Sequence, residues 1–237
     1  MIRSKNPGRL TGLLYLLVSL PGAFALVYVP SQWLVQGDPA ATIGNIMSSE
    51  PLFRLGIGAA LVSQALFIVV AFALYDLFKG VNQRLAALMV TFIAAGIPIA
   101  FLNELNSVAT LHLVHGGDLL AALEKPQRDA LAMLFVELHK HGIEVAAIFW
   151  ALWLFPMGLL VYRSGFVPRL LGILLILNCF AYLANSLASL SLPQYAATVT
   201  RWTMPLHFGE VAFIFWLLIA GARPAPPAPS LPAEAAR

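Results

Sequence analysis

The sequence predicts an all-α integral membrane protein, a bundle of six transmembrane helices. Of its 237 residues, 60% are hydrophobic and 11% carry a charge, and the mean hydropathy is +0.83. A soluble domain has about 25% charged residues, so this composition excludes one. Apolar runs long enough to cross about 30 Å of hydrocarbon recur along the chain. Each is expected to be helical, because a backbone in lipid must satisfy its own hydrogen bonds.

Six such runs define one expected transmembrane domain, residues 1–222. They lie at about residues 10–29, 52–78, 85–107, 143–162, 168–190 and 205–222. Residues 223–237 are rich in Pro and Ala and are expected to form a disordered tail. The single cysteine, Cys179, excludes a disulfide within one chain. Basic residues are scattered over short loops, so the expected partner is the lipid bilayer and not nucleic acid, and the oligomeric state stays open.

The first run follows a basic segment at residues 1–9. Together with the small-x-small sequence Ala23-Phe24-Ala25, this segment resembles a signal peptide in part. Hydrophobicity continues to Val29, and Pro21 lies well inside the run. We therefore expect a retained membrane span, with cleavage as the alternative.

Two helix signals lie outside the apolar runs. Asp38 followed by Pro39 is typical of an N-cap and first helical position, which predicts a short surface helix in the first external loop. Pro126 is expected to open a long fourth helix that continues through the membrane. Two crossings within residues 127–162 are the alternative, which we reject because the first part is too short and too charged to span. Residues 192–204 are expected to be a loop.

The distribution of Lys and Arg predicts the orientation. Nine of the fourteen fall on one side of the six spans. Cytoplasmic loops retain such an excess, so both termini are expected in the cytoplasm, with the protein in a bacterial inner membrane. In that topology all five histidines and most acidic residues lie in the outer half or in external loops. The sequence therefore predicts a polar pocket near the external face.

Ionisable side chains in a bilayer are costly unless they are paired or hydrated, so they indicate a functional site. Glu104, Glu144 and Glu210 are expected at comparable outer depths, and Arg54 is the expected counter-charge of Glu210. The plain alternative is that these carboxylates are solvated at the headgroup boundary. The complete set of candidate pocket residues is Arg54, Asn103, Glu104, His139, His141, Glu144, Asn185, His207 and Glu210.

The start of the fourth span carries a polar helix face. Glu137, His141 and Glu144 stand at i, i+4 and i+7, so they project from one side, which is expected to meet the carboxylates of other spans. His139 points elsewhere, because residues two apart lie about 200° apart on a helix. The HKH triplet therefore cannot chelate a metal from one face.

Other histidines leave a metal site as an alternative. His112 and His115 stand at i, i+3 and could converge, and His207 with Glu210 would add nitrogen and oxygen ligands suited to zinc. Near a helix end, however, the first pair is more typical of interfacial side chains that reach water. No HExxH or similar motif is present, and no metal or other cofactor is predicted.

Three blocks of sequence resemble a known membrane family. They are RLTGLLYLL from Arg9, DPAATIGNI followed by EPLFRLG up to Gly56, and LFVELH leading to VYRSGFVPRLLGILLIL. As a set they resemble the bacterial membrane family catalogued as domain of unknown function 4386, over nearly the whole chain apart from the tail. The resemblance implies a multi-pass membrane protein and no particular activity. It also implies a recurring histidine at His139, while Trp153 stands where some relatives have a second one, which argues against a two-histidine cofactor site.

Three classes of function are compatible with the sequence. Binding or transport of a small or lipophilic molecule is favoured, because polar side chains surround a prospective cavity without a recognisable catalytic set. One alternative is an intramembrane metal-dependent hydrolase with Glu144 or Glu210 as the base. The other is a structural or partner-binding protein, which would tolerate neutralisation of the outer carboxylates.

Overall fold

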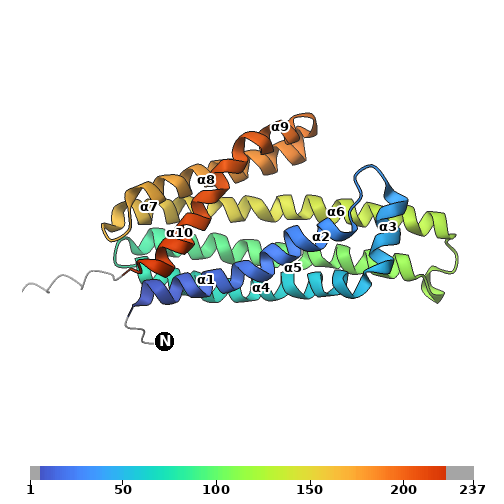
Figure 1. The fold of residues 1–237 in the computed structure, drawn as a ribbon, viewed down its shortest axis with the longest axis horizontal. Coiled ribbons are helices and arrows are strands. Elements are labelled where there is room, and N and C mark those ends of the chain that lie inside the picture. The colour runs from blue at the N-terminus through green and yellow to red at the C-terminus, as the bar shows by residue number, and fades with distance from the viewer. Residues whose placement is uncertain (1–5, 223–237) are drawn as a thin grey trace, which may run out of the picture.

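A computed structural model of the chain describes residues 6–222, and every regular element in that range is a helix (Figure 1). Six segments are long and apolar enough to cross a membrane: Pro7–Trp33, Glu50–Phe78, Gln83–His115, Lys125–Ser164, Arg169–Ser191 and Pro193–Ile219. The predicted all-α protein with six membrane-length segments is confirmed at this level. The predicted tail at 223–237 lies outside the described residues.

The first segment is one helical rod with a widened part. α1 (Pro7–Ala23) passes into a π-helical stretch (Phe24–Tyr28) and then into α2 (Val29–Trp33). Pro30 explains the widening, because proline has no N–H to donate and its ring crowds the carbonyl four residues earlier. A π turn relieves that crowding, and such turns are frequent at functional sites.

The predicted surface helix is confirmed as α3 (Pro39–Ser48). Asp38 is its N-cap, and the carboxylate accepts a backbone N–H of the first turn at 2.9 Å. α3 lies at one end of the bundle, termed here the α3 end (Figure 1). The two described ends of the chain meet at the opposite end, termed the terminal end, where the Gly8 N–H donates to the Ala222 carbonyl at 3.0 Å.

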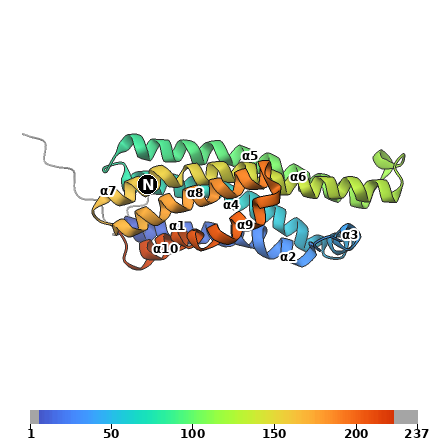
Figure 2. The same ribbon diagram turned by 90° about the horizontal axis from the view of Figure 1, so that it is seen from above.

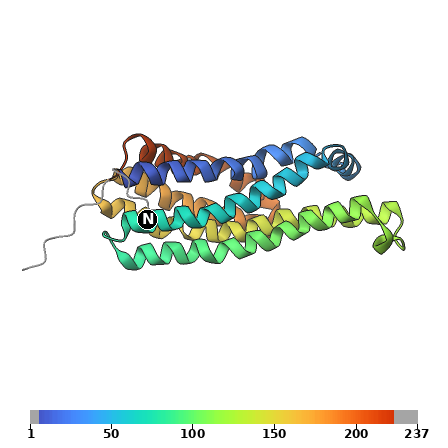
Figure 3. The same cartoon turned by 90° about the horizontal axis from the view of Figure 1, so that it is seen from below.

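α4 (Glu50–Phe78) and α5 (Gln83–His115) are antiparallel neighbours. Asn82 caps α5, with Oδ1 accepting the Leu85 N–H at 3.0 Å. Towards the α3 end, α1–α2 and α4 part from α5 and its partner α6, as Figure 2 and Figure 3 show from opposite sides. This parting makes room for the cavity described below.

The predicted long fourth helix is confirmed as α6 (Lys125–Leu152) and α7 (Leu154–Ser164), which follow each other with one interruption. Pro156 accounts for the interruption. Its ring crowds the carbonyl four residues earlier, which belongs to Leu152, the last residue of α6. Residues 125–164 form one apolar segment long enough to span, which agrees with a single crossing.

The predicted loop at residues 192–204 is wrong. α8 (Arg169–Ser191) is followed at once by α9 (Pro193–Thr203), a 3-10 turn (Met204–His207) and α10 (Phe208–Ile219). The polar composition of α9 hid the helix, although a proline at the first turn of a helix is favourable. The sixth membrane-length segment therefore begins at Pro193.

The main core lies around the α6–α7 junction. Trp153 is 2% exposed, and Met157 and Leu160 of α7 are fully buried. They pack with buried apolar side chains of α1, α4, α5, α8 and α10. A second cluster under α3 contains Ile46 and Phe53. The main core packs the helices together around the α6–α7 junction, and the second cluster packs them together at the α3 end.

Glycines allow the helices to approach closely, which matters in lipid because hydrophobic burial adds little between helices there. A Cβ at Gly158 of α7 would lie 2.7 Å from the Gly172 carbonyl oxygen of α8, and the reverse distance is also 2.7 Å. A Cβ at Gly12 of α1 would lie 2.7 Å from the Leu218 nitrogen of α10. Backbone contact at these points fixes the rotation of the helices and hence which side chains meet.

Candidate functional site

A cavity of about 480 Å³ lies at the α3 end between α1–α2, α4, α5 and α6. It is termed here the large cavity. Its wall is mostly apolar and includes Val29, Trp33 and Phe53. Glu104 of α5 and His139 of α6 are the two residues of the predicted set that line it. A mostly apolar cavity with a few polar groups is typical of a small-molecule site.

His139 is held against α5 by a polar junction. Asn103 Nδ2 donates to the His139 carbonyl at 2.9 Å, and Asn106 donates to Asn103 Oδ1 at 3.0 Å. His139 Nδ1 lies 3.1 Å from Ser107 Oγ and 3.3 Å from the Asn103 carbonyl oxygen. No described residue hydrogen-bonds His139 Nε2, so that nitrogen is available to a ligand in the large cavity.

Gly142 makes this junction possible. It lies three residues after His139 on the same face of α6, and a Cβ there would lie 1.8 Å from Asn103 Oδ1. Only a residue without a side chain lets the Asn103 amide reach the α6 backbone. Asn103 itself is 7% exposed, so its hydrogen bonds are buried.

Two polar groups near the large cavity are incompletely paired. Glu104 is half-buried with the Ser107 hydroxyl as its hydrogen-bond partner, and no Lys, Arg or His in the described part of the chain lies within ion-pair distance of it. Trp33 is 8% exposed, and its buried Nε1–H has no acceptor among residues 6–222. An acid without an ion-pair partner on the wall of a cavity is complementary to a ligand with a positive charge or a hydrogen-bond donor.

Two smaller cavities continue from the large one towards the middle of the bundle. The small cavity, of about 30 Å³, is lined by Asn103, Glu104 and Gln64. The next, termed the Glu210 cavity, has about 140 Å³ and is lined by Tyr15, Gln64 and Glu210. Gln64 is the fifteenth of the 29 residues of α4, so this row of cavities reaches half-way along that helix.

Glu210 lies deeper than predicted. Tyr15 of α1, which is 2% exposed, donates its hydroxyl hydrogen bond to Glu210 Oε1. Tyr182 of α8 and Trp153 line the same cavity. The expected pairing with Arg54 is wrong, because Arg54 Nε instead meets Glu50 Oε1 at 2.6 Å at the α3 end. His115 Nε2 also lies 2.8 Å from Glu50 Oε2.

His207 and Asn185 meet each other, away from the large cavity. His207 Nδ1 lies 2.8 Å from Asn178 Oδ1, and Asn185 Nδ2 lies 3.1 Å from His207 Nε2. Thr203 Oγ1 donates to Asn185 Oδ1 at 2.9 Å, and the Tyr182 ring lies 4.3 Å from the imidazole. Because an oxygen faces Nδ1 and an amide N–H faces Nε2, the imidazole is the neutral, Nδ1-protonated form. This network closes the 3-10 turn onto α8.

The predicted polar face of α6 divides between different surroundings. His141 is exposed, and its Nδ1 turns back to the Glu137 carbonyl at 2.8 Å. Glu144 is half-buried beside Ser186 of α8 and lines none of the three cavities. The expected meeting of Glu104, Glu144 and Glu210 is therefore not seen, and His139 is the histidine of this helix that enters the site.

The histidines of the described residues do not join a cluster that could hold a metal ion. Among residues 6–222, no group of three or more His, Cys, Asp or Glu side chains is placed to hold a metal ion. His139 faces Asn103 and Ser107, and both nitrogens of His207 face amides. The ligand set considered for zinc is thus distributed over separate parts of the bundle.

Several site residues were missed from the sequence. Ser107 and Tyr15 stand in predicted apolar runs, Trp33 follows the first run, and none of them carries a motif. Gly142 did offer a signal, because a glycine three residues from a histidine inside a helix marks a possible close approach of a neighbouring helix.

Comparisons with known proteins identify a family for nearly the whole chain. The family model described as "Domain of unknown function (DUF4386)" matches residues 10–221. An "Uncharacterized protein" of Archaeoglobus fulgidus is 30% identical over 178 residues, which cover 75% of this chain and 90% of the relative. No solved structure matches the chain.

Proposed function

We propose that the chain, which belongs to the DUF4386 family, is a multi-pass membrane protein that binds a small, largely apolar molecule carrying a positive charge or hydrogen-bond donor. The large cavity is the proposed site. The observation that carries the proposal is Glu104, a half-buried acid on the wall of a mostly apolar cavity of about 480 Å³, with no Lys, Arg or His of the described residues within ion-pair distance of it.

The ligand class follows from the lining. Glu104 favours a positive charge or a hydrogen-bond donor. The Trp33 and Phe53 rings, whose centroids are 5.4 Å apart, offer aromatic contact to an apolar or cationic group. The His139 side chain, which lines the same wall, adds a second polar contact. Asp38, Glu104 and Glu137 outnumber Lys140 among the charged residues of the lining, so an anionic ligand is disfavoured.

We also propose that the α3 end faces the outside of the cell. Nine of the fourteen Lys and Arg residues of the sequence fall on the predicted cytoplasmic side, and five of these lie at helix ends of the terminal end: Arg9, Lys79, Arg84, Arg163 and Arg169. The positive-inside rule assigns the side with this excess to the cytoplasm. The large cavity would then open to the external side. Binding from that side is compatible with transport, and uptake into liposomes tests that extension.

Binding is tested with two probes of one shape and opposite charge, tetraphenylphosphonium and tetraphenylborate. The purified protein should bind the cation in preference to the anion. Glu104→Gln should weaken binding of the cation about tenfold or more, because the attraction between the carboxylate and the positive charge is lost. Glu144→Gln is the matched control, since Glu144 is also half-buried but lines none of the three cavities.

Equal affinity for the two probes, or an unchanged affinity in Glu104→Gln, would refute the proposal. The hydrolase alternative needs metal ligands that the described residues do not bring together. The structural alternative predicts that Glu104→Gln, Glu144→Gln and Glu210→Gln together leave probe binding and growth phenotypes unchanged.

A further inference from the structure

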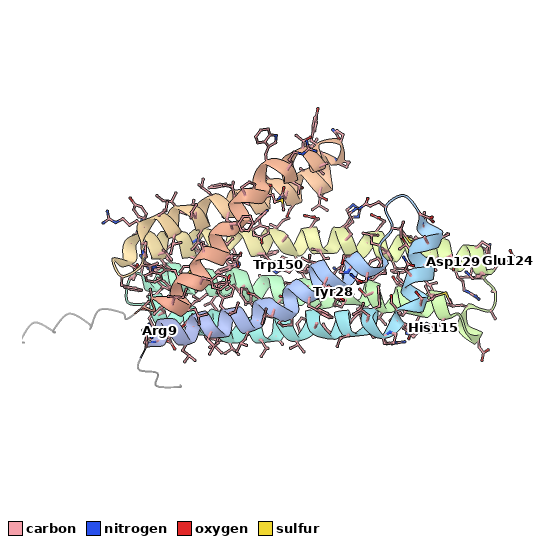
Figure 4. The ribbon with its side chains drawn as sticks, viewed as in Figure 1. Arg9, Tyr28, His115, Glu124, Asp129 and Trp150 are labelled. Atoms are coloured by element: carbon pink, nitrogen blue, oxygen red, sulfur yellow. The ribbon has the colours of Figure 1, made fainter. Side chains whose placement is uncertain are left out.

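The three cavities form a row that ends at a carboxyl group in the middle of the bundle. The large and small cavities share Leu26 and Glu104, and the small and Glu210 cavities share Ser63, Gln64 and Trp150. Figure 4 places Trp150 between Arg9 at the terminal end and His115 at the α3 end. The row therefore begins at the α3 end and reaches the centre of the membrane-length segments.

We propose that Glu210 is a proton-binding site inside the membrane, and that it exchanges protons with the α3 end of the bundle through this row of cavities. The inference rests on Glu210 and the row, and not on the ligand of the large cavity. Either proposal can fail without the other.

The groups around Glu210 favour the neutral, protonated carboxyl group over the charged carboxylate. Tyr15 of α1 and Tyr182 of α8 are the titratable groups that face it, while α4 presents Gln64 and the α6–α7 junction presents Trp153. His207, three residues earlier, is engaged by two amides. No Lys, Arg or His of the described residues lies within ion-pair distance of Glu210. An unpaired charge inside a membrane is costly, and a bound proton removes that cost.

Gln64 marks the path between the outer acid and the inner one. Its Oε1 is buried and has no hydrogen-bond partner among the described residues, and the side chain lines both the small and the Glu210 cavity. The small cavity, of about 30 Å³, exceeds the volume of about 10–15 Å³ that a cavity needs to hold one water molecule. Water there would have Glu104, Asn103 and Gln64 as polar partners.

Each proton that a water on this path gives up is replaced from the next water. A water next to Glu210 gives its proton to the free carboxylate oxygen, Oε2, which becomes O–H. That water takes a replacement proton from the water behind it, and the last proton comes from bulk water at the α3 end. Tyr15 keeps donating to Oε1, so the carboxyl group does not need to turn.

Infrared spectroscopy of the full-length protein in lipid tests the site. The C=O stretch of a protonated carboxyl group should be present at neutral pH, should disappear in Glu210→Gln, and should persist in Glu104→Gln. Glu210→Asp is the second variant, which should move the band instead of removing it. The wild-type, Glu210→Gln and Glu210→Asp proteins are compared at neutral and at acid pH. If all three show the same carboxyl band at each pH, Glu210 does not bind the proton.

Transfer to D2O tests the path, because deuterium exchange shifts the same band. Gln64→Leu should slow that exchange about tenfold, the equivalent of about 1.4 kcal/mol at the barrier. Val62→Leu, on the exposed face of the same helix, is the matched control and should exchange at the wild-type rate. Gln64→Met replaces Gln64→Leu if the leucine variant does not fold. Exchange at the wild-type rate in the folded Gln64 variant would overturn the path.

Discussion

Gly142→Ala is the sharpest test of the site geometry. The new methyl group would lie 1.8 Å from Asn103 Oδ1, which forces the Asn103 amide away from α6. The hydrogen bonds at 2.9 Å to the His139 carbonyl and at 3.0 Å from Asn106 would be lost or strained. A buried polar group left unpaired costs about 1–3 kcal/mol. Alanine returns up to about 1 kcal/mol through its higher helix propensity.

Two hydrogen bonds of the buried amide are affected, so the cost is taken from the upper half of its range, about 2–3 kcal/mol; less the alanine gain, the net expectation is a loss of about 1–2 kcal/mol in the free energy of unfolding. For a chain of this size that lowers Tm by about 2–8 °C, which thermal unfolding in detergent, followed by intrinsic fluorescence, can resolve. Gly58→Ala in α4 is the matched control, because nothing lies within 4 Å of a Cβ there. It should be neutral or stabilising.

A Gly142→Ala protein that unfolds at or above the wild-type temperature would refute the described junction. The double variant Gly142→Ala with Asn103→Ala gives an independent check, since it removes both sides of the clash. Its loss should be smaller than the sum of the two single losses, because residues in contact do not act additively.

Three further predictions concern other parts of the bundle. His207→Ala should lower the free energy of unfolding by about 2–4 kcal/mol, measured by thermal unfolding, because two amides lose their partner, and added zinc should not raise the Tm of the wild type. Arg54→Ala should change the free energy of unfolding by less than about 1 kcal/mol, since its pair with Glu50 is exposed, and a larger loss would indicate a buried partner. Ala60→Phe should weaken tetraphenylphosphonium binding, measured by equilibrium dialysis, because Ala60 lines both the large and the small cavity, and unchanged binding would place the probe elsewhere.

The membrane-length helices could be predicted from the sequence because lipid constrains the backbone strongly. A segment without water must satisfy its own hydrogen bonds, so apolar length alone indicates a helix. Local signals also sufficed for α3, where Asp38 and Pro39 encode an N-cap and first turn, and for the long α6 after Pro126. The same reasoning failed at α9, because a polar helix next to a proline has the composition of a loop.

The partners of the polar side chains could not be predicted in the same way. They depend on the rotation and axial offset of each helix, which close contacts such as Gly142 against Asn103 decide. His139 therefore enters the site, while His141 on the predicted face turns to its own backbone. By itself the sequence determined a multi-pass helical protein with its ionisable groups placed along known helices. Only the tertiary structure decided that Glu210 meets Tyr15 and not Arg54, because helix packing, and not spacing along the chain, sets distances between spans.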